Sequence, residues 1–371
     1  MIDGSERLSK LNELGQSVWY DNISRELIED GRINRLITTG VRGLTSNPSI
    51  FEKAVSSSNV YDDDILSCDP NQFSDLDVYE RLAIKDIQSA ADLLNRVYAS
   101  TGKTDGFVSL EVNPHLAHDT ESTINEGQRL FDSVGRSNLM IKVPATKEGL
   151  PAITELISRS INVNVTLIFS NTVYGQVREA YLKGLEKLED SGGDLTSVSS
   201  VASFFVSRVD TLVDSQLVKI GTEQTESMLN TIAIANAKLA YRDFKRTFSS
   251  DRFAKLEQNG ANLQRPLWAS TSTKNPHLSD VIYVDSLIGN QTVNTMPDVT
   301  LDSFLDHGCV KLTLETGIDH AESQIAALKN VGVDLESATE KLTRDGVKAF
   351  QESFDKLMAE IGLKRSSTLV N

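Results

Sequence analysis

The sequence predicts a single (β/α)₈ barrel, and three observations support that fold class. Short strand-like runs alternate with segments of helical apolar spacing, which is typical of a parallel sheet with helices outside it. Eight such runs occur, the number that closes a barrel of this kind. No proline-rich linker, fixed-period repeat or long block of like charge interrupts the 371 residues. We therefore expect one domain over residues 1–371, with additional C-terminal helices packed on the barrel.

The expected strands are short apolar runs with turn-forming residues near their ends. The first four runs are Val18–Ile23, Gly43–Ser46, Phe107–Asn113 and Leu139–Ala145. The last four runs are Asn162–Ser170, Val198–Val206, Pro266–Thr271 and Gln291–Met296.

The clearest expected helices carry an apolar stripe at helical spacing. One helix is expected to start at Ser170/Asn171. Its stripe consists of Val173, Val177, Tyr181, Gly184 and Leu188. A similar stripe near the C-terminus consists of Val347, Phe350, Phe354, Leu357 and Ile361. Each stripe needs a sheet or another helix to cover it.

Polar side chains share one face of three expected strands. Lys142 lies opposite the aliphatic residues of its run, Glu111 shares a face with Ser109, and Asn164 shares one with Thr166. If helices cover the aliphatic faces, these polar groups point into the barrel. An unpaired charge buried there is costly, so we expect this interior to be a functional site.

Composition excludes several classes of protein. Hydrophobic residues make up 39% and charged residues 24%, which is typical of a globular protein. The net charge of −15 repels nucleic acid and anionic membranes, so neither is an expected partner. No segment approaches the roughly 18 apolar residues of a membrane span. The two cysteines, Cys68 and Cys309, form no disulfide framework, and a cytoplasmic location fits best.

The sequence also lacks the usual cofactor and metal motifs. There is no GxGxxG, GxxxxGK[ST], HExxH or GxSxG pattern. His115 and His118 are the only close histidine pair, and no third ligand completes a metal set. We expect neither a cofactor nor a metal.

Lys142 and Asp21 each allow two interpretations. A lysine buried in an apolar strand loses its preference for the ammonium form, and the free amine can attack a carbonyl to give a Schiff base. The alternative is an edge lysine facing water. Asp21 follows the first run, where a carboxylate can move a substrate proton, or it is a helix N-cap before Ser24. Glu111 carries the same ambiguity, with a strand-ending turn after it.

For three further residues, the sequence suggests a functional role that it does not establish. Asn47 can bind substrate hydroxyls, or it starts a turn at Pro48. Ser203 can offer a hydroxyl, and Arg208 can clamp an anion with two hydrogen bonds. Arg208 can equally form a surface ion pair just past its strand.

Taken together, these segments resemble the transaldolase family over nearly the whole chain. The stretches that carry the resemblance are Gly43–Ser49, Ile141–Thr146, Ile161–Ser170 and Ser203–Arg208. The stretches Leu267–Pro276 and Thr292–Pro297 resemble the longer bacterial branch. The resemblance implies a (β/α)₈ barrel and a transferase without cofactor or metal. Such an enzyme carries dihydroxyacetone from a ketose phosphate to an aldose phosphate in the non-oxidative pentose phosphate pathway.

The resemblance also implies a role for each matching residue. Lys142 matches the Schiff-base lysine, Asp21 the acid/base carboxylate, and Glu111 with Thr166 the pair that holds a catalytic water. The implied substrate-binding residues are Thr45, Asn47, Asn164, Ser203, Phe205, Arg208 and Lys274.

Lys274 is assigned because this chain departs from the shorter transaldolases. They carry a second phosphate-binding arginine in a Ser-x-Arg pattern after the seventh strand, whereas here Ser272 stands at that spacing. Lys274 is the expected substitute, acting as a point charge. The acidic insertion Val60–Asp77 has no assigned role.

Two rival functions remain. A fructose 6-phosphate aldolase shares the fold and the lysine, but resembles shorter chains with glutamine in place of Glu111 and tyrosine in place of Phe205. A non-catalytic sugar-phosphate-binding barrel has no need for a nucleophilic lysine facing two carboxylates. The oligomeric state is left as monomer or homodimer.

Overall fold

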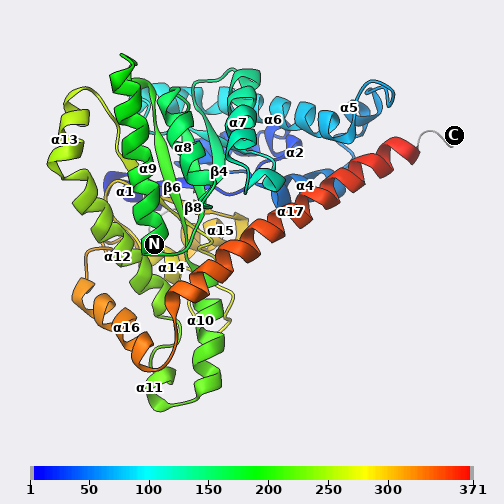
Figure 1. Ribbon diagram of the computed structural model, residues 1–371. Coiled ribbons are helices and arrows are strands. Elements are labelled where there is room, and N and C mark those ends of the chain that lie inside the picture. The colour runs from blue at the N-terminus through cyan, green and yellow to red at the C-terminus, as the bar shows by residue number, and fades with distance from the viewer. Residues whose placement is uncertain (1–3, 368–371) are drawn as a thin grey trace.

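The computed structural model describes residues 4–367, and its centre is a closed barrel of eight parallel strands in chain order (Figure 1). The strands are β1 (Gln16–Tyr20), β2 (Gly43–Leu44), β3 (Val108–Glu111), β4 (Leu139–Pro144), β5 (Val163–Ile168), β6 (Ser200–Phe205), β7 (Gln264–Ala269) and β8 (Thr292–Met296). Closure is made by β1 and β8, which pair over the full length of β1. The predicted fold class is confirmed.

Each predicted run overlaps one of these strands, but the ends differ. The first strand begins earlier than expected and ends at Tyr20, so Asp21 lies just beyond it. The second strand contains only Gly43 and Leu44, because the chain turns at Asn47 to start the next helix. At Gly43 a side chain would collide with the indole of Trp19, with ring atoms 2.7 Å from the position of a Cβ. Only glycine lets β1 and β2 approach this closely.

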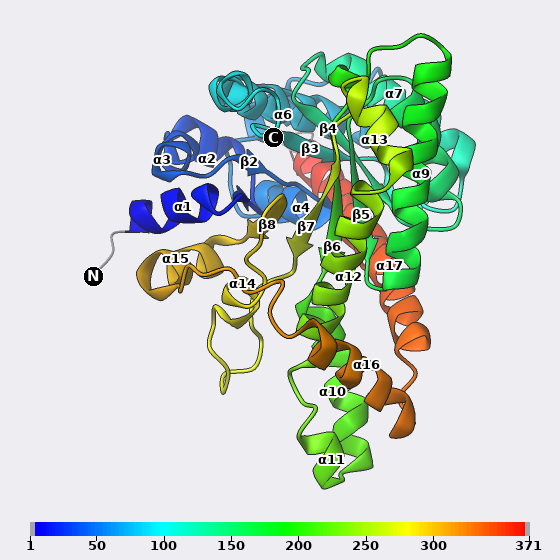
Figure 2. The same cartoon turned by 90° about the vertical axis from the view of Figure 1, so that its left-hand side faces the viewer.

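Helices surround the barrel on all sides (Figure 2). In the first half they are α1 (Gly4–Glu13), α2 (Arg25–Glu29), α3 (Arg32–Thr39), α4 (Pro48–Ser56), α5 (Asp62–Leu66), α6 (Asp75–Ser100), α7 (Thr120–Val134) and α8 (Gly149–Ser158). In the second half they are α9 (Asn171–Asp190), α10 (Ser207–Ile220), α11 (Glu223–Glu226), α12 (Ile232–Phe248), α13 (Asp251–Gln258), α14 (Ile282–Asp285), α15 (Asp298–His307), α16 (Ile318–Asn330) and α17 (Leu335–Ser367). Two short 3₁₀ helices, Pro114–Leu116 and Leu195–Ser197, complete the structure.

Local capping explains where several helices start. The Ser170 hydroxyl accepts a hydrogen bond from Val173 N and caps α9, as the sequence predicted. Ser74 and Asp77 form a reciprocal capping box at the start of α6. The acidic insertion Val60–Asp77 therefore contains α5 and the first turn of α6, where carboxylates stabilise helix N-termini.

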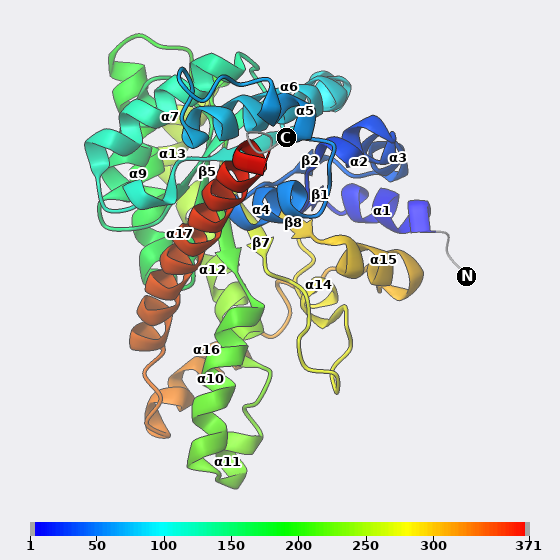
Figure 3. The same cartoon turned by 90° about the vertical axis from the view of Figure 1, so that its right-hand side faces the viewer.

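Helix α17 runs diagonally across one end of the barrel, as Figures 1 and 3 show. It is 33 residues long and packs against α4, α6 and α10. The predicted C-terminal stripe, from Val347 to Ile361, is buried on its inner face. At Gly346 an added Cβ would lie 2.9 Å from the side chain of Leu167, so the helix backbone approaches the end of β5 closely.

The opposite end of the barrel is closed by a hydrogen-bonded ion pair. Asp105 lies just before β3, while Ser17 and Arg265 lie at the starts of β1 and β7. The Asp105 carboxylate accepts hydrogen bonds from Ser17 Oγ (2.5 Å), Trp19 Nε1 (3.0 Å) and Arg265 Nη2 (2.8 Å). Arg265 Nη1 also donates to Ser17 Oγ at 3.0 Å. Both oxygens of the Asp105 carboxylate are therefore used in hydrogen bonds at this end of the barrel.

Candidate active site

A cavity of about 190 Å³ lies at the carboxyl ends of the strands, beneath α17. The predicted residues that line it are Asp21, Thr45, Asn47, Lys142, Thr166, Ser203, Phe205, Arg208 and Lys274. Of the remaining predicted residues, Glu111 contacts Lys142 and Asn164 contacts Ser203. The structure therefore brings the whole predicted set together at the end of the barrel where enzymes of this fold hold their sites.

Lys142 projects from β4 into the barrel, and its side chain is 6% exposed. Its Nζ donates a hydrogen bond to the carbonyl oxygen of Ser46 at 3.1 Å and lies 3.4 Å from Glu111 Oε2. The ring centroid of Phe350 is 5.7 Å away. The interpretation as an edge lysine facing water is excluded, because closure leaves the barrel without an edge.

Glu111 occupies the neighbouring position on β3, in register with Lys142. Burial raises the pKa of its carboxyl to about 7, although the Lys142 ammonium opposes this shift. The negative charge of Asp21 raises the pKa further. A carboxyl with a pKa near neutrality populates both protonation states and can accept and return a proton.

Thr166 lies on β5, where the strand is irregular. The register with β6 shifts between Val165 and Ile168, and Leu167 has a positive φ of 59°. A bulge of this kind re-aims the neighbouring side chains, and Thr166 lines the cavity. Its buried hydroxyl has no hydrogen-bond partner among the described residues, so it is available for water or substrate.

Asp21 lies directly after β1, and its backbone nitrogen donates to Met296 O at 2.9 Å. Its carboxylate accepts a 2.6 Å hydrogen bond from Thr45 Oγ1, which also shares a 2.7 Å hydrogen bond with Thr295. The alternative role as a helix N-cap is wrong, because Ser24 caps α2 through Leu27 N. The Asp21 carboxylate is therefore free of capping and faces the cavity.

Asn47 starts a turn, as one of its two interpretations predicts, and it also lies at the cavity. Its side-chain oxygen accepts a hydrogen bond from Ile50 N at 3.0 Å and caps α4. The same side chain lines the cavity. The turn therefore holds the amide at the wall of the site.

The floor of the site is a chain of buried hydrogen bonds. Ser203 Oγ donates to Asn164 Oδ1 at 2.7 Å, and Asn164 Nδ2 donates to Ser109 Oγ at 3.0 Å. These residues come from β6, β5 and β3. Such a network fixes both the serine hydroxyl and the amide in place.

Arg208 and Lys274 give one part of the cavity a positive charge. Arg208 lies in the first turn of α10, half-buried, with its guanidinium 5.4 Å from the ring centroid of Phe205. Burial lowers its pKa, and the charge of Asp21 partly offsets this. No ion-pair partner of Arg208 exists within residues 4–367, so the surface ion-pair interpretation is wrong. Lys274 is exposed on the loop after β7.

Several lining residues were missed by the sequence analysis. They are Ala269, Ser270, Ser272, Thr295, Pro297 and Phe350. Phe350 was assigned only to the apolar stripe of α17, which does not distinguish a ring over the cavity from a ring in the core. Ser270 has a positive φ of 56°, and such strain gathers at functional sites.

The two histidines of the close pair each form a hydrogen bond with a surface carboxylate. His115 contacts Asp355, and His118 contacts Glu148. Across the described part of the chain, no three His, Cys, Asp or Glu side chains are grouped to hold a metal ion. The helices within residues 4–367 are all too short or too polar to cross a membrane.

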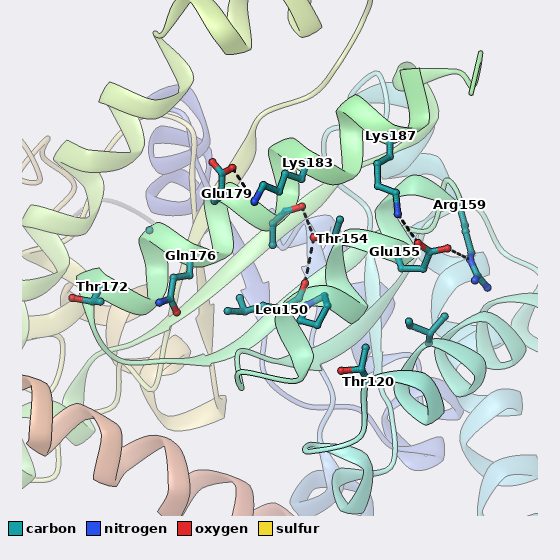
Figure 4. Close-up of a pocket in the computed structure, with 14 residues that line it drawn as sticks. Thr120, Leu150, Thr154, Glu155, Arg159, Thr172, Gln176, Glu179, Lys183 and Lys187 are labelled. Carbon is teal, nitrogen blue, oxygen red and sulfur yellow. Dashed lines mark hydrogen bonds and ion pairs between the residues drawn. The ribbon is translucent and has the colours of Figure 1, made fainter. Parts of the chain in front are cut away.

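A larger concavity of about 990 Å³ lies outside the barrel, between α8 and α9 (Figure 4). Its charged residues pair with one another: Lys183 with Glu179, and both Arg159 and Lys187 with Glu155. None of the predicted site residues lines it. Size alone therefore does not identify the active site of this chain.

Comparison with known proteins identifies the family. Residues 18–361 match the family described as Transaldolase/Fructose-6-phosphate aldolase. A transaldolase of Trichodesmium erythraeum is 45% identical, with 95% of this chain and 96% of the relative aligned. A transaldolase of Frankia alni is also 45% identical, over 98% of this chain and 99% of the relative. One of Neisseria meningitidis serogroup C is 43% identical, over 95% and 99% respectively. The chain belongs to the transaldolase/fructose-6-phosphate aldolase family.

Proposed function

We propose that this chain acts as a transaldolase through a Schiff base on Lys142. The donor is a ketose phosphate such as fructose 6-phosphate or sedoheptulose 7-phosphate. The acceptor is erythrose 4-phosphate or glyceraldehyde 3-phosphate. The observation that carries the proposal is Lys142 itself, a buried amine 3.4 Å from a carboxylate and open to a polar cavity.

The first step is attack of the Lys142 amine on the donor carbonyl at C2, followed by loss of water to give an iminium. Glu111 exchanges the protons of this step through a water held by the Thr166 hydroxyl. Its pKa of about 7 suits that task, because it can both take and return a proton near neutrality.

The second step breaks the bond between C3 and C4. Asp21 takes the proton of the C4 hydroxyl, and the electron pair of the breaking bond moves into the iminium. An aldose phosphate leaves, and a three-carbon enamine stays on Lys142. Asn47, Asn164 and Ser203 hold its hydroxyls until an acceptor aldehyde arrives and the steps reverse.

Arg208 and Lys274 bind the substrate phosphate. The guanidinium can form two parallel hydrogen bonds to phosphate oxygens, whereas the ammonium adds a point charge. Thr45 holds Asp21, and Phe205 stacks under Arg208.

The proposal includes the conditions under which the enzyme works. It needs neither cofactor nor metal, since the lysine supplies the electron sink. It binds neither nucleic acid nor membrane. Cys68 and Cys309 are free thiols, which fits a reducing cytoplasm. The working form is a monomer or a homodimer.

Borohydride reduction in the presence of fructose 6-phosphate, followed by peptide mass mapping, tests the proposal. We expect a three-carbon adduct on Lys142. Lys147→Met, at an exposed lysine just past β4, is the matched control and should keep the adduct. An adduct on another lysine would overturn the assignment. Binding of the sugar phosphate with no adduct would favour a binding protein, and release of dihydroxyacetone in preference to transfer would favour an aldolase.

A further inference from the structure

Helix α17, which follows all eight strands in the sequence, covers the mouth of the barrel. Helix α17 contacts the top of β5 through Gly346, where an added Cβ would clash with Leu167. Two turns further on, Phe354 packs edge-on against Tyr79 of α6, with the ring centroids 5.4 Å apart. Phe350 lies between these two anchor points.

Polar contacts hold this part of α17 in place. Gln351 Nε2 donates to Pro114 O at 3.2 Å, and Ser353 shares a 2.7 Å hydrogen bond with Ser49. Asp355 pairs with His115 at 2.7 Å. The position of the Phe350 ring is therefore fixed by contacts on both sides of it.

The two sides of the Lys142 amine differ sharply. On the strand side, it faces the Glu111 carboxylate and the Ser46 carbonyl oxygen. On the α17 side, it faces the Phe350 ring, whose centroid is 5.7 Å from Nζ. Phe350 is only 5% exposed and lines the cavity. The amine thus has polar neighbours that can exchange protons and an apolar ring of α17 close to it.

We propose that Phe350 is a specificity-determining residue that protects the Lys142-bound enamine from water, so that its carbon unit passes to an aldehyde acceptor. This inference rests on the proposed function. The ring excludes water from the α17 side of the cavity. Its negative face also attracts the positive charge that the nitrogen carries in the iminium.

The chemistry of the enamine explains why exclusion of water by the Phe350 ring affects the outcome of the reaction. In transfer, the enamine carbon forms a bond to the acceptor carbonyl carbon, and the acceptor oxygen takes a proton from Asp21. In the competing loss, the same carbon takes a proton instead, water adds at C2 of the resulting iminium, and the C–N bond breaks. That route yields free dihydroxyacetone and the Lys142 amine. Both routes end in hydrolysis of an iminium, so they differ in whether a proton reaches the enamine carbon first.

Phe350→Ala tests the inference through the ratio of two products. Fructose 6-phosphate and erythrose 4-phosphate are supplied, and free dihydroxyacetone is measured against sedoheptulose 7-phosphate. Loss of the ring should raise the dihydroxyacetone fraction about tenfold, which corresponds to about 1.4 kcal/mol between the barriers for protonation and for transfer. Phe350→Leu keeps an apolar wall and should fall between wild type and Phe350→Ala.

Leu357→Ala is the matched control, because Leu357 is buried on the same stripe and does not line the cavity. It should lower stability and leave the product ratio unchanged. An unchanged ratio in Phe350→Ala would overturn the inference, as would a larger dihydroxyacetone fraction in Phe350→Leu than in Phe350→Ala. Borohydride trapping distinguishes failure of this inference about Phe350 from failure of the proposed function. An adduct on Lys142 in wild type, with no change in ratio on removal of the ring, removes only the role of Phe350.

Discussion

The two ends of the barrel interior both bury a charged pair, but they treat it differently. At the closed end, Asp105 accepts hydrogen bonds from Ser17, Trp19 and Arg265, and both of its oxygens are used. At the α17 end, Glu111 Oε2 lies 3.4 Å from Lys142 Nζ yet accepts no hydrogen bond from any described residue. One pair is saturated, and the other retains capacity for new bonds.

The contrast separates stability from chemistry within one fold. A buried ion pair with every hydrogen bond formed is costly to break, because removal of one partner leaves an uncompensated charge. A pair with unused atoms stabilises less and can bind or exchange protons. We therefore expect substitutions at the closed end to lower stability and substitutions at the open end to lower activity.

The largest effect on activity is expected from Lys142→Met. Methionine fills a similar volume and cannot form a Schiff base, so kcat/KM should fall by at least about 10⁴-fold. The fold should remain, because the neighbouring Glu111 can stay protonated. Steady-state assays and thermal unfolding of Lys142→Met and Lys147→Met measure both effects. Residual activity within tenfold of wild type would remove Lys142 from the mechanism.

At the closed end, Asp105→Ala should act on stability alone. It leaves the Arg265 guanidinium, whose side chain is only 14% exposed, without its partner. We expect a loss of about 3–5 kcal/mol in the free energy of unfolding. Urea unfolding measures this loss, and kcat of the folded variant should stay near the wild-type value. A fall in kcat without a loss of stability would contradict the division between the two ends.

Glu111 makes the open end sensitive to pH. Its raised pKa, about 7, keeps the carboxyl protonated at lower pH, so the base form becomes populated only as the pH rises. The limb of kcat/KM governed by this group should therefore increase between about pH 6 and 8, with its midpoint near 7. Glu111→Gln should lose roughly 10²- to 10⁴-fold in rate and lose that limb. A wild-type profile that is flat across this range would contradict the role of Glu111.

Local pattern predicted much of this molecule. The alternation of strands and helices predicted the barrel, and the alternation of faces within strands placed Glu111, Lys142 and Thr166 inside it. These signals are local, with periods of two and 3.6 residues. The exact strand ends were less accessible, because turns and tertiary hydrogen bonds set them. For example, β1 ends at Tyr20, whereas the sequence pattern predicted an extended run as far as Ile23.

The features that the sequence did not predict depend on contacts between segments that are distant in the chain. Nothing near Asp105 distinguishes it from a loop aspartate, because its partners Ser17 and Arg265 lie on other strands. Phe350 lies more than 200 residues after Lys142 in the sequence, and only the packing of α17 brings the two together. An apolar stripe predicts that a face is covered, and it does not tell which side chain meets a cavity.

The smallest effect is expected at the rim of the open end, where Lys274 is exposed and Arg208 is half-buried. An exposed charge contributes about 0.2–1 kcal/mol to an ion pair, so Lys274→Ala should raise KM for fructose 6-phosphate by only about 1.4- to 5-fold. Arg208→Ala should raise it more, because its partly desolvated guanidinium can hold phosphate with two hydrogen bonds. Neither variant should change KM for the unphosphorylated sugar. If Lys274→Ala leaves the preference for the phosphorylated sugar unchanged, Arg208 holds the phosphate without it, and the wall of the cavity, not its rim, sets the selectivity.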